Sequence, residues 1–311
     1  MDARRCPLVF IIGDLILDRY VEGKVTHIAP DAPVPVFVEE AIYYKPGGMW
    51  NVALNLHATG AKVFTFGVAG DDSIVDMVGA DAFRKKHLFT LKVPSRRTHI
   101  KTRYLGQYLQ QVLRVDIPKD GPISVTTQHD LLTELLGMVE REGQPDGIFI
   151  ADYGCGVVTG NLISALKNLF PETFLMVDPY PTQEPTIYQG VDLVKLNRGE
   201  RQNFERKLGS FKMTDLFPVV IETRGNEAVL IQRAGEQVEV TVPQRELVDA
   251  CGAGDSFAAY LMTAILHDQS LEEAVSIAAH AGACCISHRG VHVVTPDEVA
   301  ASMAACSKNT P

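Results

Sequence analysis

A short glycine-rich segment in the C-terminal part of the chain has residue types suited to phosphoryl transfer. Gly252, Ala253 and Gly254 precede Asp255, and the apolar run Phe257-Ala-Ala-Tyr-Leu-Met262 follows. A Gly-Ala-Gly turn that opens a helix exposes backbone N–H groups at the positive end of the helix dipole, where they stabilise negative charge. Asp255 at this helix start can accept the proton of an attacking hydroxyl. An aspartate that only caps the helix explains the segment equally well.

Carboxylate and amide side chains follow several apolar runs. Leu8-Val-Phe-Ile-Ile12 leads to Asp14, and three later runs end in Asp152, Asp178 and Asn197. Polar groups at the carboxyl ends of strands line a shared crevice in open α/β sheets. We therefore expect these four side chains to lie along one edge of a sheet.

The elements that would position these residues follow an α/β order. Strand-like and helix-like patterns alternate through most of the chain, which predicts a mostly parallel sheet covered by helices. We expect strands at 8–12, 63–67, 147–152, 174–178, 193–197, 217–222 and 228–232, and helices at 51–58, 161–169, 254–267 and 271–286.

Two further β-like stretches interrupt this alternation. Residues 34–44 are β-like, with Pro33 and Pro35 favouring an edge strand. Residues 98–116 alternate in polarity around a turn near Gly106. We predict one domain spanning 1–311, with a discontinuous β lid formed by about 15–45 and 96–117.

Composition excludes several classes of protein. A hydrophobic fraction of 46% and a charged fraction of 22% are typical of a folded globular chain. The net charge of −9 argues against a general nucleic-acid binder. The sequence has neither a membrane-spanning apolar run nor a signal peptide. Its six cysteines lack a Cys-x-x-Cys spacing, which favours reduced thiols over a disulfide framework or a zinc site. We expect a cytoplasmic protein.

The glycine-rich segments together resemble the ribokinase-like (PfkB) carbohydrate kinases. The resemblance rests on Gly252–Ser256 before its apolar helix and on Gly47-Gly48-x-x-Asn51-x-Ala53, and it extends over essentially the whole chain. It implies a three-layer α/β sandwich with a small β lid, ATP as phosphoryl donor and Mg²⁺ as metal. It also implies that Asp255 is the catalytic base, with the Gly-Ala-Gly turn beside the transferred phosphoryl group.

The resemblance implies binding roles for several other positions. Carboxylate and amide groups bond sugar hydroxyls, Gly-Gly permits close backbone approach, and Mg²⁺ needs only a few protein oxygens, often through water. The implied sugar contacts are Asp14, Gly47, Gly48 and Asn51; Asn197 and Glu200 act around Mg²⁺ and the phosphates; Thr223, Arg224, Gly225, Gly252 and Gly254 lie near the nucleotide. Asp249 matches a monovalent-cation (K⁺) position, although a turn-forming aspartate explains it as well.

The N-terminal half resembles one group within this family. Gly13–Tyr20, which includes Asp18, looks like the kinases that phosphorylate the C1 hydroxyl of D-glycero-D-manno-heptose 7-phosphate, and so do 28–36 and 101–116. The product, a 1,7-bisphosphate, would serve ADP-heptose synthesis for the lipopolysaccharide core. The substrate's own phosphate needs cations, for which Lys101, Arg103 and Arg114 are candidates. Alternatively, these charges simply face water on a lid strand.

Three positions depart from the heptose kinase pattern. Met49-Trp50 stands where Ala-Ala is usual, so Trp50 either narrows the sugar pocket or packs in the core. Cys155 replaces a lysine, which removes a positive charge and leaves a small residue that we expect to be inert. His280 replaces an asparagine and either borders the adenine or is bonded within its helix.

Three functions remain open at this stage. The first is a heptose 7-phosphate kinase, the second a kinase of the same family for another sugar or sugar phosphate, and the third a nucleotide- or sugar-binding homologue that has lost catalysis. The partners implied are ATP and a sugar phosphate, without nucleic acid or membrane. An apolar lid face with Val36, Val38 and Ile42 also suggests a homodimer through the lids, as in relatives.

Overall fold

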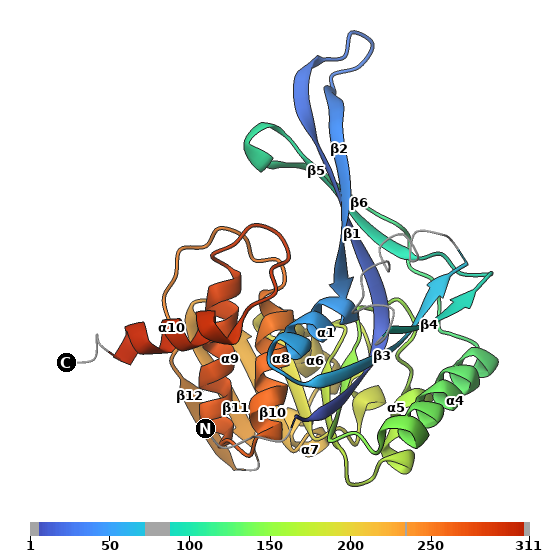
Figure 1. Ribbon diagram of the computed structural model, residues 1–311, viewed down its shortest axis with the longest axis vertical. Helices are drawn as coiled ribbons and strands as arrows, with labels where there is room; N and C mark the ends of the chain where they lie inside the picture. Colours follow the sequence, from blue (N-terminus) through green and yellow to red (C-terminus); the bar gives the residue numbers. More distant parts are fainter. Residues whose placement is uncertain (1–5, 72–87, 234, 308–311) are drawn as a thin grey trace.

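A mostly parallel sheet lies between two layers of helices in the computed structural model, which describes residues 6–71, 88–233 and 235–307 (Figure 1). Neighbours from β10 to β4 are parallel, whereas β11 and β12 are antiparallel. This confirms the predicted α/β class. Across the sheet the strands are β12 (Glu236–Val240), β11 (Glu227–Arg233), β10 (Val219–Arg224), β9 (Leu193–Asn197), β8 (Phe174–Asp178), β7 (Gly147–Ala151), β1 (Leu8–Ile28), β3 (Lys62–Gly70) and β4 (Leu88–Val93).

The sheet has a hydrophobic core on each face because its side chains alternate. In β1, Val9 and Ile11 join one core, while Phe10 and Ile12 join the other. The first core is covered by α1 (Met49–Ala58), α8 (Ala253–Leu266), α9 (Leu271–Cys285) and α10 (Pro296–Ser307). The second is covered by α4 (Val125–Glu142), α5 (Gly160–Leu169), the 3₁₀ turn η2 (Pro185–Tyr188), α6 (Arg198–Leu208) and α7 (Met213–Leu216).

The first strand differs from our prediction that it ends before Asp14. Strand β1 pairs with β3 as far as Asp14, and from Leu15 onward it pairs with β2 (Pro35–Gly48) instead. It therefore leaves the main sheet and continues as the central strand of a second sheet. Asp14 lies where the strand passes from one sheet to the other, and the apolar residues Leu15, Ile16 and Leu17 that follow are buried.

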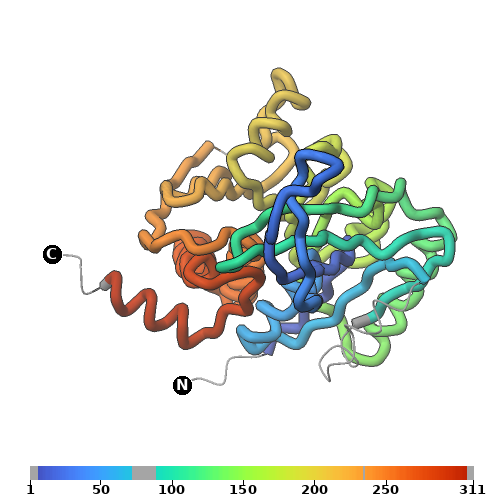
Figure 2. The backbone as a smooth tube through the Cα atoms, turned by 90° about the horizontal axis from the view of Figure 1, so that it is seen from above, coloured from blue at the N-terminus to red at the C-terminus, as the bar shows by residue number. Residues whose placement is uncertain are grey.

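The second sheet projects from the carboxyl edge of the main sheet as a long blade, here called the lid (Figures 1 and 2). Its order is β2, β1, β5 (His99–Leu105) and β6 (Gln111–Asp116). The turn between β5 and β6 contains η1 (Gln107–Leu109), in which Tyr108 and Leu109 have positive φ angles. Among the described residues, the helices are too short or too polar to cross a membrane.

Strand register gives the lid two unlike faces. On one face the register aligns Asp18 with Lys101 and Asp116, and aligns Arg103 with Arg114. On the other face it aligns apolar side chains. That apolar row consists of Ile42, Val21, Tyr104 and Leu113, with Val115 beside it.

Candidate active site

The carboxylate of Asp255 accepts one hydrogen bond on each oxygen. It lies in the first turn of α8, where Asn51 Nδ2 donates to Oδ2 over 2.6 Å and Tyr153 Oη donates to Oδ1 over 2.8 Å. Burial raises the pKa of Asp255 above its usual range, and the bonds from Asn51 and Tyr153 oppose that rise. The site thus holds a basic carboxylate in a fixed orientation.

The turn before Asp255 needs glycine for conformation and for space. Gly252 is the N-cap of α8 with φ 81°, and a Cβ there would lie 2.9 Å from Asn51 Nδ2. The next residues, Ala253 and Gly254, begin the helix, so their N–H groups lack acceptors within it, and Ala253 N makes only a long bond of 3.4 Å to Ala250 O. This arrangement offers donors for an anion beside the Asp255 carboxylate.

The Gly47-Gly48 pair brings the lid close to the main sheet. A Cβ on Gly47 would collide with the carboxylate of Asp18, and a Cβ on Gly48 would lie 2.8 Å from the carbonyl oxygen of Asp14. Gly48, with φ 57°, is also the N-cap of α1, the helix that presents Asn51 to Asp255. The two glycines therefore set where Asn51 and Asp18 lie.

Asp14 is completely buried, and its two oxygens accept three backbone N–H groups. The donors are Tyr153 at 2.9 Å, Cys155 at 2.8 Å and Val157 at 3.0 Å. Asp14 thus holds the loop that presents Tyr153 to Asp255. Its contact with a sugar stays a prediction, and Asp18, four residues on, lies on the lid face that carries the cations.

Asp152 also organises this loop. It accepts bonds from Gly154 N at 2.7 Å and Tyr188 Oη at 2.6 Å. Burial, together with the nearby charge of Asp14, raises the pKa of Asp152 to about 7. Asp14 and Asp152 therefore both accept hydrogen bonds from groups of the protein itself.

Lys195 is a site residue that sequence reasoning missed. It is 5% exposed in β9, and its Nζ lies 2.7 Å from Asp178 Oδ2. A Cβ on Gly254 would lie 3.1 Å from that Nζ, so the ammonium group adjoins the Gly-Ala-Gly turn. A lysine inside the apolar run Leu193–Leu196 is itself a sequence signal, because lysine is almost never fully buried without a partner.

Asn197 and Glu200 form a capping box at the start of α6. Asn197 Oδ1 accepts from Glu200 N at 3.0 Å, and Glu200 Oε2 accepts from Asn197 N at 2.7 Å. Burial, together with the charge of Asp178, raises the pKa of Glu200. These bonds use Glu200 Oε2, and the bond from Lys195 uses Asp178 Oδ2. The other oxygen of each carboxylate could therefore hold Mg²⁺ through water.

The three predicted phosphate-binding cations, Lys101, Arg103 and Arg114, lie on the same lid face as Asp18. Arg103 forms an ion pair with Asp18, and Arg114 forms a bidentate one with Asp116 at 2.6 and 2.8 Å. Lys101 Nζ lies 5.6 Å from the centre of the Tyr153 ring. Two arginines aligned across strands β5 and β6 repel each other unless anions lie near both, which here include Asp18 and Asp116.

With this geometry described, sequence comparison identifies the domain. Residues 159–298, which include Asn197, Glu200 and Asp255, match the pfkB family of carbohydrate kinases. This part of the chain is similar to the pfkB carbohydrate kinases. This confirms the predicted family and the enzyme class, a phosphotransferase with an alcohol group as acceptor.

Curated relatives of this kinase domain share about three in ten residues with it. The proteins named bifunctional protein HldE from Hyphomonas neptunium and Helicobacter pylori are 31% and 30% identical over 95% and 94% of this chain. The chain spans 63% and 65% of their respective lengths, which is less than two thirds.

Solved structures support the fold of the kinase. Phosphofructokinase-2 from Escherichia coli, in complex with substrates and products, has a TM-score of 0.76 at 17% identity and covers 97% of this chain and 99% of its own. The same enzyme in complex with potassium has a TM-score of 0.76 at 18% identity, covering 97% and 100%. Ribokinase from Thermotoga maritima has a TM-score of 0.73 at 17% identity, covering 96% and 99%. The predicted ribokinase-like architecture is confirmed.

The residues predicted near the nucleotide lie at two places: Gly252 and Gly254 at the start of α8, and residues 223–225 at the end of β10. Arg224, at the end of β10, bonds Glu222 at 3.1 Å and Glu239 at 2.9 Å, between Thr223 and the turn glycine Gly225. Glu222 and Glu239 already bond the Arg224 guanidinium, so a contact of Arg224 with a nucleotide would compete with these ion pairs, and its nucleotide role stays a prediction.

His280 and Asp249 both have partners within the protein. His280 is buried in α9, with its Nδ1 2.8 Å from Ser302 Oγ, and burial lowers its pKa. Asp249 accepts from Cys251 N and from Gly290 N, each at 2.9 Å. The geometry favours a bonded helix histidine and a turn-forming aspartate, and the adenine and cation roles stay predictions.

The remaining departures from the heptose kinase pattern lie in the interior. Trp50 is 2% exposed within the core on the α8 side, which favours the packing interpretation. Cys155 is buried, and burial raises the pKa of its thiol to about 12, so it is protonated at neutral pH. Lys119 Nζ donates to Tyr153 O at 2.5 Å, so the loop that contains Cys155 has a lysine ammonium group beside it even though position 155 is not lysine.

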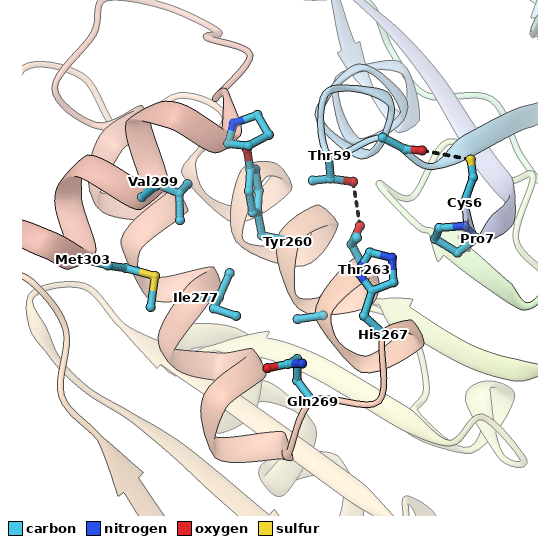
Figure 3. Close-up of a pocket in the computed structure, with 14 residues that line it drawn as sticks. Cys6, Pro7, Thr59, Tyr260, Thr263, His267, Gln269, Ile277, Val299 and Met303 are labelled. Carbon is cyan, nitrogen blue, oxygen red and sulfur yellow. Dashed lines mark hydrogen bonds between the residues drawn. The ribbon is translucent and has the colours of Figure 1, made fainter. Parts of the chain in front are cut away.

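A separate hollow of about 890 Å³ lies between α8, α10 and the N-terminal end of β1 (Figure 3). Among the described residues that line it, none is a carboxylate, and Tyr260, Ile277, Val299 and Met303 make it largely apolar. Thr263, which also lines it, lies about 12 Å along α8 from Asp255 at the helical rise of 1.5 Å per residue. The hollow is therefore distinct from the candidate active site.

Proposed function

We propose that this chain is an ATP-dependent kinase that phosphorylates the C1 hydroxyl of D-glycero-D-manno-heptose 7-phosphate. One observation carries the proposal: the Asp255 carboxylate is held by Asn51 and Tyr153 at the N-terminal end of α8, directly after the Gly-Ala-Gly turn. The resemblance of the N-terminal half to heptose kinases, together with the HldE relatives, supports the choice of sugar.

The chemical step follows from this placement. Asp255 takes the proton of the sugar hydroxyl, and the oxygen attacks the γ-phosphorus of ATP in line as the bond to ADP breaks. The N–H groups at the start of α8 and the Lys195 ammonium stabilise the charge on the transferred group. Mg²⁺, when bound, neutralises phosphate charge, and Asn197 and Glu200, with Asp178 nearby, are the residues that would hold it through water.

The lid supplies the part of the site that selects the substrate. Asp18 offers an acceptor for sugar hydroxyls, and Lys101, Arg103 and Arg114 share its face. The 7-phosphate would bind these cations, displacing carboxylate partners of the two arginines. Closure of the lid over the sugar would exclude water from the phosphoryl group.

The proposal also includes a homodimer contact and a K⁺ site. The apolar lid face, with exposed Ile42 and Leu113, would pair with a second copy to form a homodimer in the cytoplasm. The 249–252 turn would bind K⁺, since the similar phosphofructokinase-2 has been solved in complex with potassium.

A second candidate is a kinase of the same family for another sugar phosphate. It is favoured by the existing ion pairs of Arg103 and Arg114, which reduce the positive charge available to a 7-phosphate. A nucleotide- or sugar-binding homologue without catalysis is the third possibility, motivated by Cys155 in place of lysine.

An ADP-release assay over a panel of sugars and sugar phosphates separates these functions. The proposal expects turnover with heptose 7-phosphate and a C1 phosphate signal in the ³¹P NMR spectrum of the product. Turnover of only another sugar phosphate would support the second candidate. Nucleotide binding by calorimetry without turnover of any sugar would support the third.

A further inference from the structure

Two histidines and a glutamate meet outside the kinase site, between the end of α9 and the start of α10. Among the described residues, His288, His292 and Glu298 form the group of metal-ligating side chains whose ligand atoms all lie within 4.8 Å of one another. None of them touches Asp255 or belongs to the motifs that define the family. We propose that these three residues form a binding site for a transition-metal dication of the Zn²⁺ class.

The distances suit a single ion. His292 Nε2 lies 3.0 Å and His288 Nε2 lies 3.7 Å from Glu298 Oε1. Two ligand atoms that each lie about 2.1 Å from a tetrahedral Zn²⁺ are about 3.4 Å apart. These two separations lie on either side of this value, and all three ligand atoms lie within 4.8 Å of one another. An ion would replace the hydrogen bond between His292 and Glu298, and the rings would rotate to direct both nitrogens at it.

Hydrogen bonds around the group orient its ligand atoms. His288 Nδ1 lies 3.1 Å from the carbonyl oxygen of Cys284, which can only accept, so Nδ1 carries the proton and Nε2 keeps its lone pair. Glu298 Oε2 accepts from Thr295 N at 2.7 Å and from Thr295 Oγ1 at 2.8 Å, which leaves Oε1 toward the histidines. Such outer bonds are what position ligands in metal sites.

The ligand types select the metal. Two imidazoles and one carboxylate suit Zn²⁺, with water in the fourth position, because the three side chains are 27–45% exposed. Mg²⁺ prefers an octahedral shell of oxygen atoms and is a poor match. The histidine rings are stacked with their centres 3.7 Å apart, and the Nε2 atom of each lies within 3.7 Å of Glu298 Oε1.

A metal here would restrain residues 288–292, a segment that contacts both the lid and the 249–252 turn. Between the two histidines, Gly290 N donates to Asp249 and Val291 O accepts from Lys45 of β2 at 3.3 Å. Arg289 donates to Tyr108 O at 3.1 Å. Zn²⁺ at the histidines would therefore restrain a segment that contacts both the lid and the 249–252 turn.

The test uses Co²⁺ and Zn²⁺ with the full chain. Since the free cysteines also bind these ions, the visible spectrum of bound Co²⁺ separates nitrogen and oxygen ligation from thiolate ligation. We expect one Co²⁺ per chain without a thiolate charge-transfer band, displaced by Zn²⁺, and a rise in Tm with Zn²⁺. His288→Ala and His292→Ala should each lose this ion, and His129→Ala, an exposed histidine on α4, should keep it.

The control against misfolding is His292→Gln, which keeps a polar group opposite Glu298 but lacks the imidazole ligand. It should fold and still lose the ion. Equal Co²⁺ stoichiometry in wild type, His288→Ala and His292→Gln would overturn the proposal. So would a bound ion whose spectrum shows thiolate ligation only.

Discussion

The proposed catalytic base, Asp255, is a carboxylate in a position where burial raises its pKa. Removal from water raises the pKa of Asp255, whereas the donors Asn51 and Tyr153 stabilise its charged form. A raised pKa makes the ionised carboxylate a better proton acceptor, and the two donors keep it oriented. Each donor is therefore expected to influence the pH dependence of turnover.

Replacing Tyr153 with Phe removes one donor to Asp255 and keeps the ring. The charged form of Asp255 then loses stabilisation, so its pKa rises further. Since the base works only when ionised, the acid limb of the kcat/KM profile should move to higher pH, with roughly a tenfold loss of activity at the acid side. An unchanged acid limb would mean that the Tyr153 bond does not act on the base.

Lys195 provides a second test at the residue scale. Lys195→Met removes the ammonium group beside Gly254 and leaves Asp178 buried without its cation. We expect kcat to fall by about 10²–10³-fold, as for loss of a transition-state donor. Asp178→Asn together with Lys195→Met restores charge balance, so it should recover Tm, whereas kcat should stay low because the variant lacks both the ammonium group and a carboxylate proposed for Mg²⁺. Recovery of both would assign Lys195 a purely structural role.

The sequence allowed Asp255, Asn51 and the glycine turn to be predicted because they form local motifs. Tyr153 and Lys195 were not placed in the site, because their positions depend on which strands are neighbours. Asp14 was assigned to the sugar from the motif alone. Its three bonds to the 153–157 loop depend on the chain returning to β1 more than a hundred residues later.

At the scale of elements, the start of α8 depends on its approach to α1. Gly252→Ala places a methyl group at φ 81° and 2.9 Å from Asn51 Nδ2. We expect a loss of about 1–2 kcal/mol in the free energy of unfolding and more than a tenfold loss of kcat, since Asn51 must move.

Gly60→Ala is the matched control for this substitution. Gly60 has φ 93° at the end of α1, with nothing within 4 Å of an added Cβ. It should lower the free energy of unfolding to a similar degree and leave kcat unchanged. Equal losses of kcat in both variants would contradict the role given to the Gly252 turn.

Most strands and helices were predictable because their apolar periodicity is clear, and the length of β1 was the exception. We expected β1 to end at the crevice, where polar residues usually follow a parallel strand. Instead Leu15, Ile16 and Leu17 continue the strand into the lid. The apolar pattern of β1 continues across the point where it stops pairing with β3 and begins to pair with β2, so periodicity alone cannot locate that point.

At the scale of the whole molecule, the lid has a charged face toward the kinase site and an apolar face away from it. A sheet that exposes Ile42 and Leu113 to water is expected to pair with another surface. Leu113→Glu should therefore convert a dimer to a monomer in sedimentation velocity, and Val125→Glu, on α4 and 81% exposed, should not. A wild-type monomer would contradict the proposed lid contact.

The most direct test of the account is turnover by Asp255→Asn with saturating ATP and the best sugar phosphate. The substitution keeps the side-chain shape and removes a buried charge, so folding and ATP affinity should be nearly unchanged. We expect kcat to fall by roughly 10²–10⁴-fold and its dependence on the base's pKa to disappear. Turnover close to that of the wild type, with ATP still bound, would contradict Asp255 as the base.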